Sequence, residues 1–545
     1  MHNMEILLRE RLSAGLRRTS VSTCSRWAKE FRIMGQPFPG PWSHEYHPWT
    51  KAMLDCNDDW VGQKCAQVGF TEVALNRVFY KIDVERVDCL YVLPTKTPDA
   101  SDFSAARFDP ALDLSDHLSA LFSDVKNIGH KRAGSVNLYI RGSRSRSQLK
   151  SIPTGFIVFD EVDEMNQENI SLAEERMSGQ RVKQNVKIST PSIDGFGINK
   201  YFKNSTQEHW FFPCPHCGRI IELTFPENII ITAESLVDSR INDTHLICHL
   251  CKKKLDHEKK SKYLTRGNWV EKYEQRSLRG FHINQLYSST VSPPELAKSY
   301  IKAQIDPTEE QEFYNSKLGE SHVVKGARIT DDMIEDCIGQ HKQGARSSKF
   351  VTMGVDVGSW LHVEIDEWDF ISGLNVNDIN LLSRPRLICQ KRVLNFEELD
   401  SLMREYGIYF VIIDANPERR KATEFCRRFH GYSRMCFYGN NVNGKELHDK
   451  PEEYSVTVDR TSWIDLALGR FKSKNIILPV DTDHEYKEHI KAPVRVYKKD
   501  ADGNPVSKYV EGSNADHYAH SRTYSEIALQ FAAAISQAQD MRIKL

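Results

Sequence analysis

The sequence predicts an α/β protein of several domains, and three observations lead to this prediction. The apolar run at 155–159 leads directly into Asp160 and Glu161, as in a buried parallel strand that delivers acids to one edge of a sheet. A second apolar run, at 409–413, ends in Asp414. Between these runs lie two Cys-x-x-Cys pairs. We therefore expect two α/β units and a metal-binding insertion.

Length and composition narrow the class of protein. A chain of 545 residues exceeds what one hydrophobic core usually supports, so two or three domains are expected. The net charge of −1 excludes a uniformly basic protein, so contacts with nucleic acid would come from local basic patches. The sequence contains neither an apolar run long enough to span a membrane nor a secretory signal. Most of the 12 cysteines are scattered, which favours a reducing compartment.

Residues 60–80 have the layout of a phosphate-binding loop: an apolar strand, a short loop and an apolar helix. The usual lysine just before the helix is missing, because Phe70 stands in its place. The basic residue available is Lys64 at the start of the loop, whose long flexible side chain can still reach a nucleotide phosphate. Gly69 would shape the loop, and Thr71 would offer a hydroxyl to Mg²⁺. A chance turn is the alternative interpretation.

The acids after the first strand suit a nucleotide hydrolase. Asp160 would hold Mg²⁺ through water, and Glu161 would orient the attacking water. A core strand that ends in solvated acids is the alternative. A further short strand at 186–188 ends in the hydroxyl residues Ser189 and Thr190, as in segments that couple nucleotide state to movement in helicase-like motors.

A basic, serine-rich stretch precedes the acid-tipped strand. It would either form a solvated loop or contact phosphates, those of DNA or the γ-phosphate bound by a neighbouring subunit. Both interpretations stay open. The cationic or potentially cationic residues are His130, Lys131, Arg132, Arg141, Arg144, Arg146 and Lys150.

The two cysteine pairs give the most specific local pattern in the chain. Two thiolate pairs on tight turns provide the four sulfur ligands that Zn²⁺ favours, and they leave no position for water. A zinc ion held in this way would be structural rather than catalytic. The predicted ligands are Cys214, Cys217, Cys248 and Cys251.

The second α/β unit carries three acids in a characteristic order. Asp356 lies within the apolar strand at 350–357, where burial makes a charge costly unless a cation compensates it. Asp414 ends a later strand, and Asp516 lies at the start of a late helix. This is the arrangement of RNase H-like nucleases, whose carboxylates bind two divalent ions that drive attack on a phosphodiester. Each acid taken alone would have a structural role.

With these motifs the chain resembles the large subunits of tailed-phage terminases of the GpA type, the motors that cut concatemeric viral DNA and pump it into a prohead. The resemblance covers nearly the whole chain, and this family also places the phosphate-binding lysine at the beginning of the loop. The matching segments are 64–71, 94–95, 107–110, 160–161, 189–191, the two cysteine pairs, 281–287 and 516–519.

The resemblance implies a role for each site residue. Lys64 would bind the phosphates, Thr71 and Asp160 would bind the Mg²⁺ that accompanies ATP, and Glu161 would be the catalytic acid. The catalytic Mg²⁺ or Mn²⁺ ligands of the nuclease would be Asp356, Asp414 and Asp516. The arginine that acts on a neighbouring subunit stays unassigned, with the candidates Arg107, Arg132, Arg141 and Arg144.

The resemblance also implies an organisation and a set of partners. Double-stranded DNA, a small terminase subunit and the prohead portal are expected partners of a ring-forming homo-oligomer in the host cytoplasm, without a membrane. A long portal-docking tail is expected to be absent. The expected segments are a basic arm at 1–45, a P-loop ATPase domain at 46–205, a zinc-knuckle insertion at 206–275, a helical connector at 276–348 and an RNase H-like nuclease domain at 349–545.

Two other functions compete with this interpretation. One is a helicase-nuclease of a repair or defence system, which would unwind DNA without a portal. The other is a transposase-like or architectural DNA-binding protein whose first unit has lost ATPase activity. The presence of Lys64, Asp160 and Glu161 together argues against the second.

Overall fold

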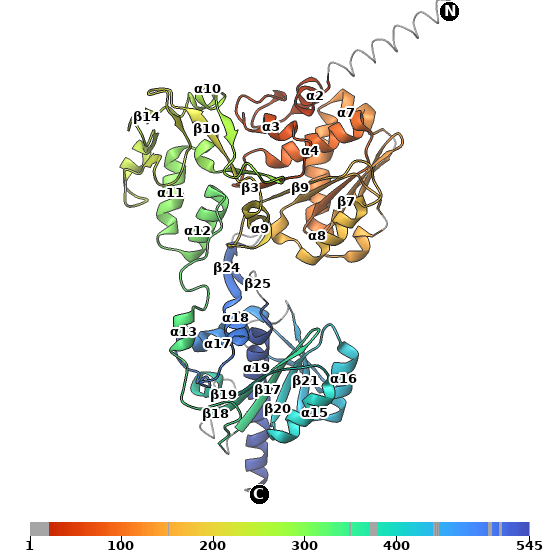
Figure 1. Cartoon of the computed structure of the whole chain (residues 1–545), viewed down its shortest axis with the longest axis vertical. Helices are drawn as coiled ribbons and strands as arrows, with labels where there is room; N and C mark the ends of the chain where they lie inside the picture. The colour runs from red at the N-terminus through yellow and green to blue at the C-terminus, as the bar shows by residue number, and fades with distance from the viewer. Residues whose placement is uncertain are drawn as a thin grey trace, which may run out of the picture. The chain divides into compact units, whose positions relative to one another are not determined.

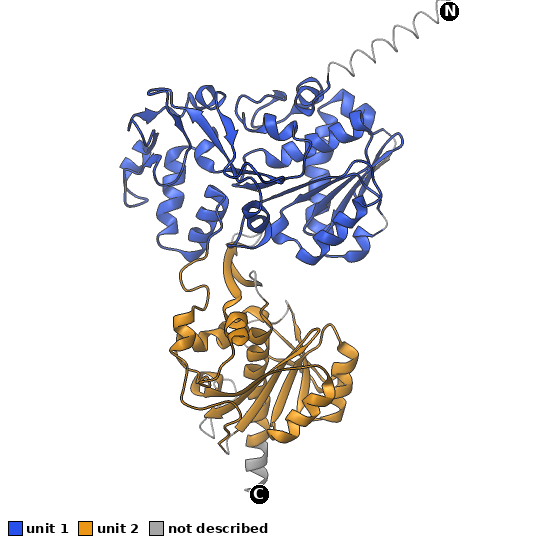
Figure 2. Cartoon of the chain, in the orientation of Figure 1, with its two compact units in different colours: residues 1–322 blue, residues 323–545 orange. Residues whose placement is uncertain are grey.

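The chain divides into two compact units, 1–322 and 323–545, in the computed structural model (Figure 2). None of the helices in the described ranges is long and apolar enough to cross a membrane. The first half of the expected basic arm lies outside the described residues. The structure describes residues 21–123, 125–150, 152–347, 350–369, 379–439, 442, 444, 446–499, 504–511 and 515–543.

A large, mostly parallel sheet forms the core of unit 1 (Figure 1). In the described residues it has 11 strands in the order β11-β10-β16-β3-β9-β8-β4-β7-β6-β5, with β15 beside β10. Every neighbouring pair from β16 to β7 is parallel, so the carboxyl ends of these strands meet at one edge. The strands are β3 Trp60–Lys64, β4 Cys89–Leu93, β5 Val125–Asn127, β6 His130–Ala133, β7 Val136–Gly142, β8 Phe156–Asp160, β9 Gln184–Ser189, β10 Glu208–Pro213, β11 Ile220–Ile221, β15 Asn268–Val270 and β16 Arg279–Ile283.

The central strands β3, β4, β8 and β9 are buried along their whole length, which shows that both faces of this sheet are covered. The helix α4 follows β3 and buries most of its residues. A small hairpin of β1 Ile33–Met34 and β2 Gly40–Pro41 precedes it. The α-helices before β10 are α2 Cys24–Phe31, α3 Thr50–Leu54, α4 Phe70–Tyr80, α5 Ser101–Phe103, α6 Asp109–Asp113, α7 Asp116–Leu121, α8 Gln167–Glu174 and α9 Gly197–Lys203.

The segment expected to be a zinc-knuckle insertion, 206–275, is partly built into the main sheet. Its strand β10 pairs in parallel with β16 and antiparallel with β11 and β15. The rest forms a separate three-stranded sheet and one short helix. These elements are β12 Ile229–Ile230, β13 His245–Ile247, β14 Lys254–Leu255 and α10 Lys260–Leu264.

The segment expected to be a helical connector, 276–348, is shared between the two units. Its first strand, β16, lies inside the main sheet beside β3, where it supplies hydrogen bonds that β3 would otherwise lack on that side. The helix α11, Pro293–Ala303, starts behind a capping box formed by Ser292 and Glu295, and proline suits its first turn. The other helices are α12 Pro307–Glu312 in unit 1 and α13 Asp331–Glu335 in unit 2.

Unit 2 is built on a mixed sheet of seven strands within the described ranges, in the order β19-β18-β17-β20-β21-β23-β22. β17, β18 and β19 are antiparallel neighbours. β17, β20, β21 and β23 run parallel. The strands are β17 Phe350–Val357, β18 Leu361–Asp369, β19 Arg384–Val393, β20 Phe410–Asp414, β21 Ser433–Tyr438, β22 His448–Lys450 and β23 Ser455–Val458, with a separate hairpin of β24 Pro493–Lys499 and β25 Pro505–Glu511.

Helices cover both faces of this sheet. Alternate residues of β20 belong to different cores: Ile413 packs with α15 and α16, whereas Ile412 packs with α19. A Cβ on Gly354 of β17 would collide with the carbonyl of Ser521, so glycine permits the close approach of α19. The helices are α14 Ile379–Leu382, α15 Phe396–Glu405, α16 Arg419–Arg428, α17 Arg460–Lys472, α18 His484–Lys491 and α19 His517–Ile543.

A fully buried ion network anchors α19. Arg522 of this helix lies 2.7 Å from the Glu364 carboxylate of β18 and also pairs with Asp366. Glu526, one turn later, receives hydrogen bonds from Arg522 and from Arg470 of α17. Because an unpaired buried charge is very costly, this network fixes the rotation of α19 and so decides where the residues at its start lie.

Candidate functional site

Parallel packing brings the expected nucleotide-site residues to one edge of the first sheet. Lys64 ends β3, Asp160 ends β8 and Ser189 ends β9, and the order β3-β9-β8 makes these strands neighbours. Glu161 follows directly, and its N–H donates to the carbonyl of Ile188 in β9 at 2.9 Å. Residues far apart in the chain therefore meet at the end of the sheet.

The loop after β3 leads into an uncapped helix start. Gly69 takes a left-handed backbone conformation, with φ +86°, and no side chain caps α4, so the N–H groups of the first turn suit an external anion. Thr71 lies in this turn, and its side chain interacts with Asp160. The Phe70 ring is buried against Gly62, so Phe70 can meet a phosphate through its backbone N–H but not through its side chain.

Lys64 and Glu161 form an ion pair, with 2.9 Å between Nζ and Oε1. Although burial opposes the charge, the carboxylates of Glu161 and Asp160 raise the pKa of the Lys64 ammonium above its ordinary value. Glu161 has φ +65°, a strained conformation for a residue other than glycine. Such strain is found where the surrounding structure imposes it, often at functional sites.

Asp160 is a buried carboxylate with one oxygen unused by the protein. Tyr91 donates its hydroxyl to Oδ2 at 2.7 Å, whereas Oδ1 has no hydrogen-bond partner among the described residues. Burial, assisted by the charge of Glu161, raises the pKa of Asp160 to about 6. An unpartnered carboxylate oxygen beside the Thr71 hydroxyl fits a hydrated Mg²⁺, which prefers such oxygen ligands.

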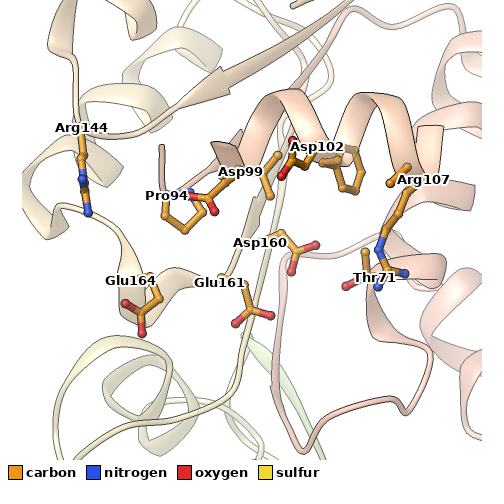
Figure 3. Close-up of a pocket in the computed structure, with 12 residues that line it drawn as sticks. Thr71, Pro94, Asp99, Asp102, Arg107, Arg144, Asp160, Glu161 and Glu164 are labelled. Atoms are coloured by element: carbon orange, nitrogen blue, oxygen red, sulfur yellow. The ribbon is translucent and has the colours of Figure 1, made fainter. Parts of the chain in front are cut away.

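These acids line a cavity of about 460 Å³. Figure 3 shows Asp160 and Glu161 between Arg107 and Thr71 on one side and Arg144 on the other. The remaining lining residues come from the end of β4, from the segment after it and from the turn after β8. They are Leu93, Pro94, Asp99, Asp102, Phe103, Ala106 and Glu164.

The cavity separates the four candidate arginines into two groups. Arg107 and Arg144 line it. Arg132 and Arg141, on β6 and β7, do not line it, and their guanidinium groups donate to backbone carbonyls instead. Of these four arginines, only the first two are therefore brought to the candidate nucleotide site of their own chain.

Sequence reasoning missed a layer of residues behind the loop. Gly319, with φ +68°, packs so closely that a Cβ would lie 2.7 Å from the backbone nitrogen of Cys65. Its carbonyl accepts a hydrogen bond from Gln63 at 2.9 Å, and the Ala66 N–H donates to the carbonyl of Ser316 at 2.8 Å. No local pattern could reveal these contacts, because they join segments that are far apart in sequence.

Asp163, another residue that was missed, ties the acidic strand to the segment after β9. Its Oδ2 accepts hydrogen bonds from the N–H and hydroxyl of Ser192, at 2.8 and 2.6 Å, and its Oδ1 accepts one from the Ile198 N–H at 2.7 Å. Burial raises the pKa of Asp163 to about 6. The spacing of this third acid after Asp160 and Glu161 was a signal that could have drawn attention to it.

A second candidate site consists of four thiols in unit 1. All four sulfur atoms lie within 4.8 Å of one another, and the Sγ atoms of Cys214 and Cys251 are 4.0 Å apart. A tetrahedral zinc site with ordinary Zn–S bonds needs sulfur separations of about 3.8 Å, so the set fits. The turns are alike, because the N–H groups of Gly218 and Lys252 donate to the carbonyls of Cys214 and Cys248. The four residues are Cys214, Cys217, Cys248 and Cys251.

Two of the expected acids of unit 2 lie at neighbouring strand ends. β17 and β20 are parallel with Val355 opposite Ile413, which makes Asp356 and Asp414 neighbours at the strand ends. Burial, with a contribution from the charge of Asp356, raises the pKa of Asp414 to about 6. Asp516 precedes α19, and its link to the other two acids runs through the side chains of this helix.

Two of these helix side chains contact the acids. His520 forms an ion pair with Asp516, with 3.3 Å between Nε2 and Oδ2. Although burial opposes it, this interaction lowers the pKa of Asp516. One turn later, the side chain of Tyr524 interacts with Asp414. The start of α19 thus brings the third acid to the edge where the other two lie.

Sequence reasoning also missed the histidines of this centre. The Nδ1 atom of His517 lies 2.9 Å from Oδ2 of Asp356, and His362 stands opposite Asp356 in the antiparallel pair of β17 and β18. The presence of His517 and His520 beside Asp516 was a signal in the sequence. His362 gave none, because only strand register brings it to Asp356.

The comparisons with known proteins concern both units. The family described as phage terminase large subunit gpA, ATPase domain, matches residues 36–269, and the one described as terminase large subunit gpA, endonuclease domain, matches residues 278–539. The large terminase of HK97 bacteriophage has a similar fold, with a TM-score of 0.50 and 10% identity over 93% of this chain and 99% of that chain. A large terminase from a thermophilic bacteriophage aligns over 86% of this chain and 93% of that chain, with 11% identity and a TM-score of only 0.29. No curated protein matches the chain.

Proposed function

The chain belongs to the gpA family of phage terminase large subunits, and from this premise we propose how its residues perform ATP hydrolysis and DNA cutting in viral genome packaging. The family assignment makes the chain an ATPase and an endonuclease that acts on DNA. The comparisons give no support to a helicase-nuclease of repair or to a DNA-binding protein without ATPase activity.

In the ATPase domain, Lys64 and the N–H groups from Gly69 onward would bind the phosphates of ATP. Thr71 and Asp160 would hold the accompanying Mg²⁺, which supplies charge neutralisation at the phosphates. Glu161 would orient the attacking water and accept its proton. The observation that supports this proposal best is the contact of Lys64 with Glu161 at 2.9 Å, made by residues 97 positions apart.

In the nuclease domain, the ends of β17 and β20 and the start of α19 would hold divalent ions. Such ions lower the pKa of a bound water and stabilise charge on the phosphodiester. The ligands would be Asp356, Asp414 and Asp516. The adjacency of Asp356 and Asp414 and the link of Asp516 through α19 support this assignment.

The four cysteines would hold Zn²⁺ as a structural ion that clamps the two turns of residues 206–275 together. Double-stranded DNA would be the substrate. A small terminase subunit and the prohead portal would be the protein partners. We also propose that the protein works as a ring of identical subunits in the host cytoplasm. Within such a ring, an arginine of one subunit would reach a neighbouring subunit's nucleotide, whereas Arg107 and Arg144 line the cavity of their own chain.

The test measures two activities of the full chain, wild type and the variants Lys64→Ala and Asp356→Ala. ATP hydrolysis is followed with and without duplex DNA, and cutting is followed on a long duplex. We expect Lys64→Ala to abolish hydrolysis but not metal-dependent cutting, and Asp356→Ala to do the reverse. Equal hydrolysis by wild type and Lys64→Ala would mean that the nucleotide binds elsewhere.

A further inference from the structure

The nuclease centre contains imidazole groups that the three-carboxylate assignment does not use. Possible ligand atoms of Asp356, His362 and His517 all lie within 4.8 Å of one another. This compact set includes Asp356 but neither of the other two acids. It joins the end of β17, the start of β18 and the first residue of α19.

His362 is buried and incompletely paired. The residue is 4% exposed, and its Nδ1 atom has no hydrogen-bond partner among the described residues. Its neighbour His489 is 7% exposed and also has a buried Nδ1 without a partner in the described part of the chain. Buried polar atoms are nearly always satisfied, so the unpartnered nitrogen of His362 beside the Asp356 carboxylate indicates that something else binds there.

The imidazole of His517 is held against the carboxylate. Its Nδ1 lies 2.9 Å from Oδ2 of Asp356, and its ring stacks on His362 with 4.4 Å between the ring centroids and 15° between the planes. One ion cannot lie in the planes of two stacked rings. Coordination by both histidines therefore requires the His517 ring to turn out of its hydrogen bond with Asp356, which frees the carboxylate oxygen for the same ion.

We propose that His362 and His517 supply nitrogen ligands to a divalent ion held by Asp356, so that the cutting centre of this chain is a mixed nitrogen–oxygen site. The inference rests on the proposed role of Asp356 in the nuclease. Imidazole binds first-row transition ions much better than Mg²⁺, which prefers oxygen ligands and water. The site therefore favours Mn²⁺ over Mg²⁺.

The experiment uses Mn²⁺ as the probe and the full chain as the protein. Pulsed electron paramagnetic resonance of bound Mn²⁺ detects directly coordinated ¹⁴N, and calorimetry gives the affinities for Mn²⁺ and Mg²⁺. The variants are His362→Gln, His517→Gln and Asp356→Asn. His489→Gln is the matched control, because His489 belongs to the same ring cluster but lies outside the ligand set. The four-thiol site does not interfere, since thiolates select softer ions than Mn²⁺.

We expect a ¹⁴N signal in the wild type that falls in both ligand variants and persists in the control. Loss of one ligand should weaken Mn²⁺ binding about tenfold or more, with a smaller effect on Mg²⁺. Mn²⁺ that binds through Asp356 without any ¹⁴N signal, or a signal unchanged in both ligand variants, would overturn the mixed site and leave the nuclease assignment standing. Mn²⁺ binding that is indifferent to Asp356→Asn would overturn both.

Discussion

The Nζ atom of Lys64 lies 2.9 Å from Oε1 of Glu161, so the lysine assigned to the phosphates and the acid assigned to the attacking water neutralise each other. Phosphates that bind Lys64 would compete for its charge and release the Glu161 carboxylate. The proposed base would then become available as the phosphates of ATP bind.

Replacement of Glu161 by Gln separates binding from chemistry. Glutamine keeps the shape of the side chain but cannot accept the proton of water, so ATP hydrolysis should fall by about 10²–10⁴-fold. ATP binding should persist, because Lys64 loses a competitor. Turnover and nucleotide affinity measure the two effects.

The control for this prediction is Asp102→Asn, which changes another acid that lines the same cavity. It should alter hydrolysis far less. Equal losses in both variants would indicate a general electrostatic effect of the cavity and would remove Glu161 from the chemistry.

The raised pKa of Asp160 predicts a pH dependence. The carboxylate form binds Mg²⁺, and with a pKa of about 6 its population falls from about 90% at pH 7 to about 10% at pH 5. Because the pKa is raised, binding is favoured above pH 6 and lost as the pH falls through this value. An ordinary aspartate would remain ionised at pH 5.

The measurement is the affinity of the purified chain for Mg²⁺ with a non-hydrolysable ATP analogue, titrated at several pH values. Tyr91→Phe removes a hydrogen bond that stabilises the carboxylate, so it should shift the loss of binding to higher pH. Affinity that stays constant down to pH 5 would contradict the assignment of Asp160.

The four-thiol site predicts one tightly held zinc ion for each chain. Cys214→Ser and Cys251→Ser should each lose this ion and unfold the small sheet of β12, β13 and β14, because binding of a structural metal contributes folding free energy. Zinc content by atomic absorption and protease sensitivity of residues 206–275 measure the two effects.

Cys389→Ser serves as the control, since Cys389 is a buried thiol of unit 2 outside the four-thiol set. It should keep the zinc. A zinc-free wild type that resists protease in this segment would show that the four thiols need no metal.

The close contact of Gly354 with α19 predicts that DNA cutting depends on the position of this helix. A methyl group there would collide with the Ser521 carbonyl, so Gly354→Ala should push the helix away and cost about 1–3 kcal/mol of unfolding free energy or more. DNA cutting should fall because Asp516 and His517 move with the helix, whereas ATP hydrolysis should remain.

Gly469→Ala is a matched control on α17, because no atom lies within 4 Å of a Cβ added at that position. Its unfolding midpoint in urea and its cutting rate should stay near those of the wild type. If Gly354→Ala also behaves like the wild type, the contact of β17 with α19 is more tolerant than its geometry implies.

Much of the candidate site could be predicted from local patterns. Apolar runs that end in acids mark Asp160, Glu161 and Asp414, and the spacing of the cysteines marks four sulfur ligands. Such patterns are readable because strand burial and ligand geometry constrain residues that are close together in sequence.

The remaining features depend on contacts between distant segments. The sequence by itself determined two α/β units, the acids at their strand ends and the four thiols. Only the tertiary structure decided that Gly319 supports the loop, that β10 and β16 complete the first sheet, and that His362 and His517 meet at Asp356. Strand register and helix packing bring these groups together, and neither leaves a local signal in the chain because each is decided by the packing of the whole unit.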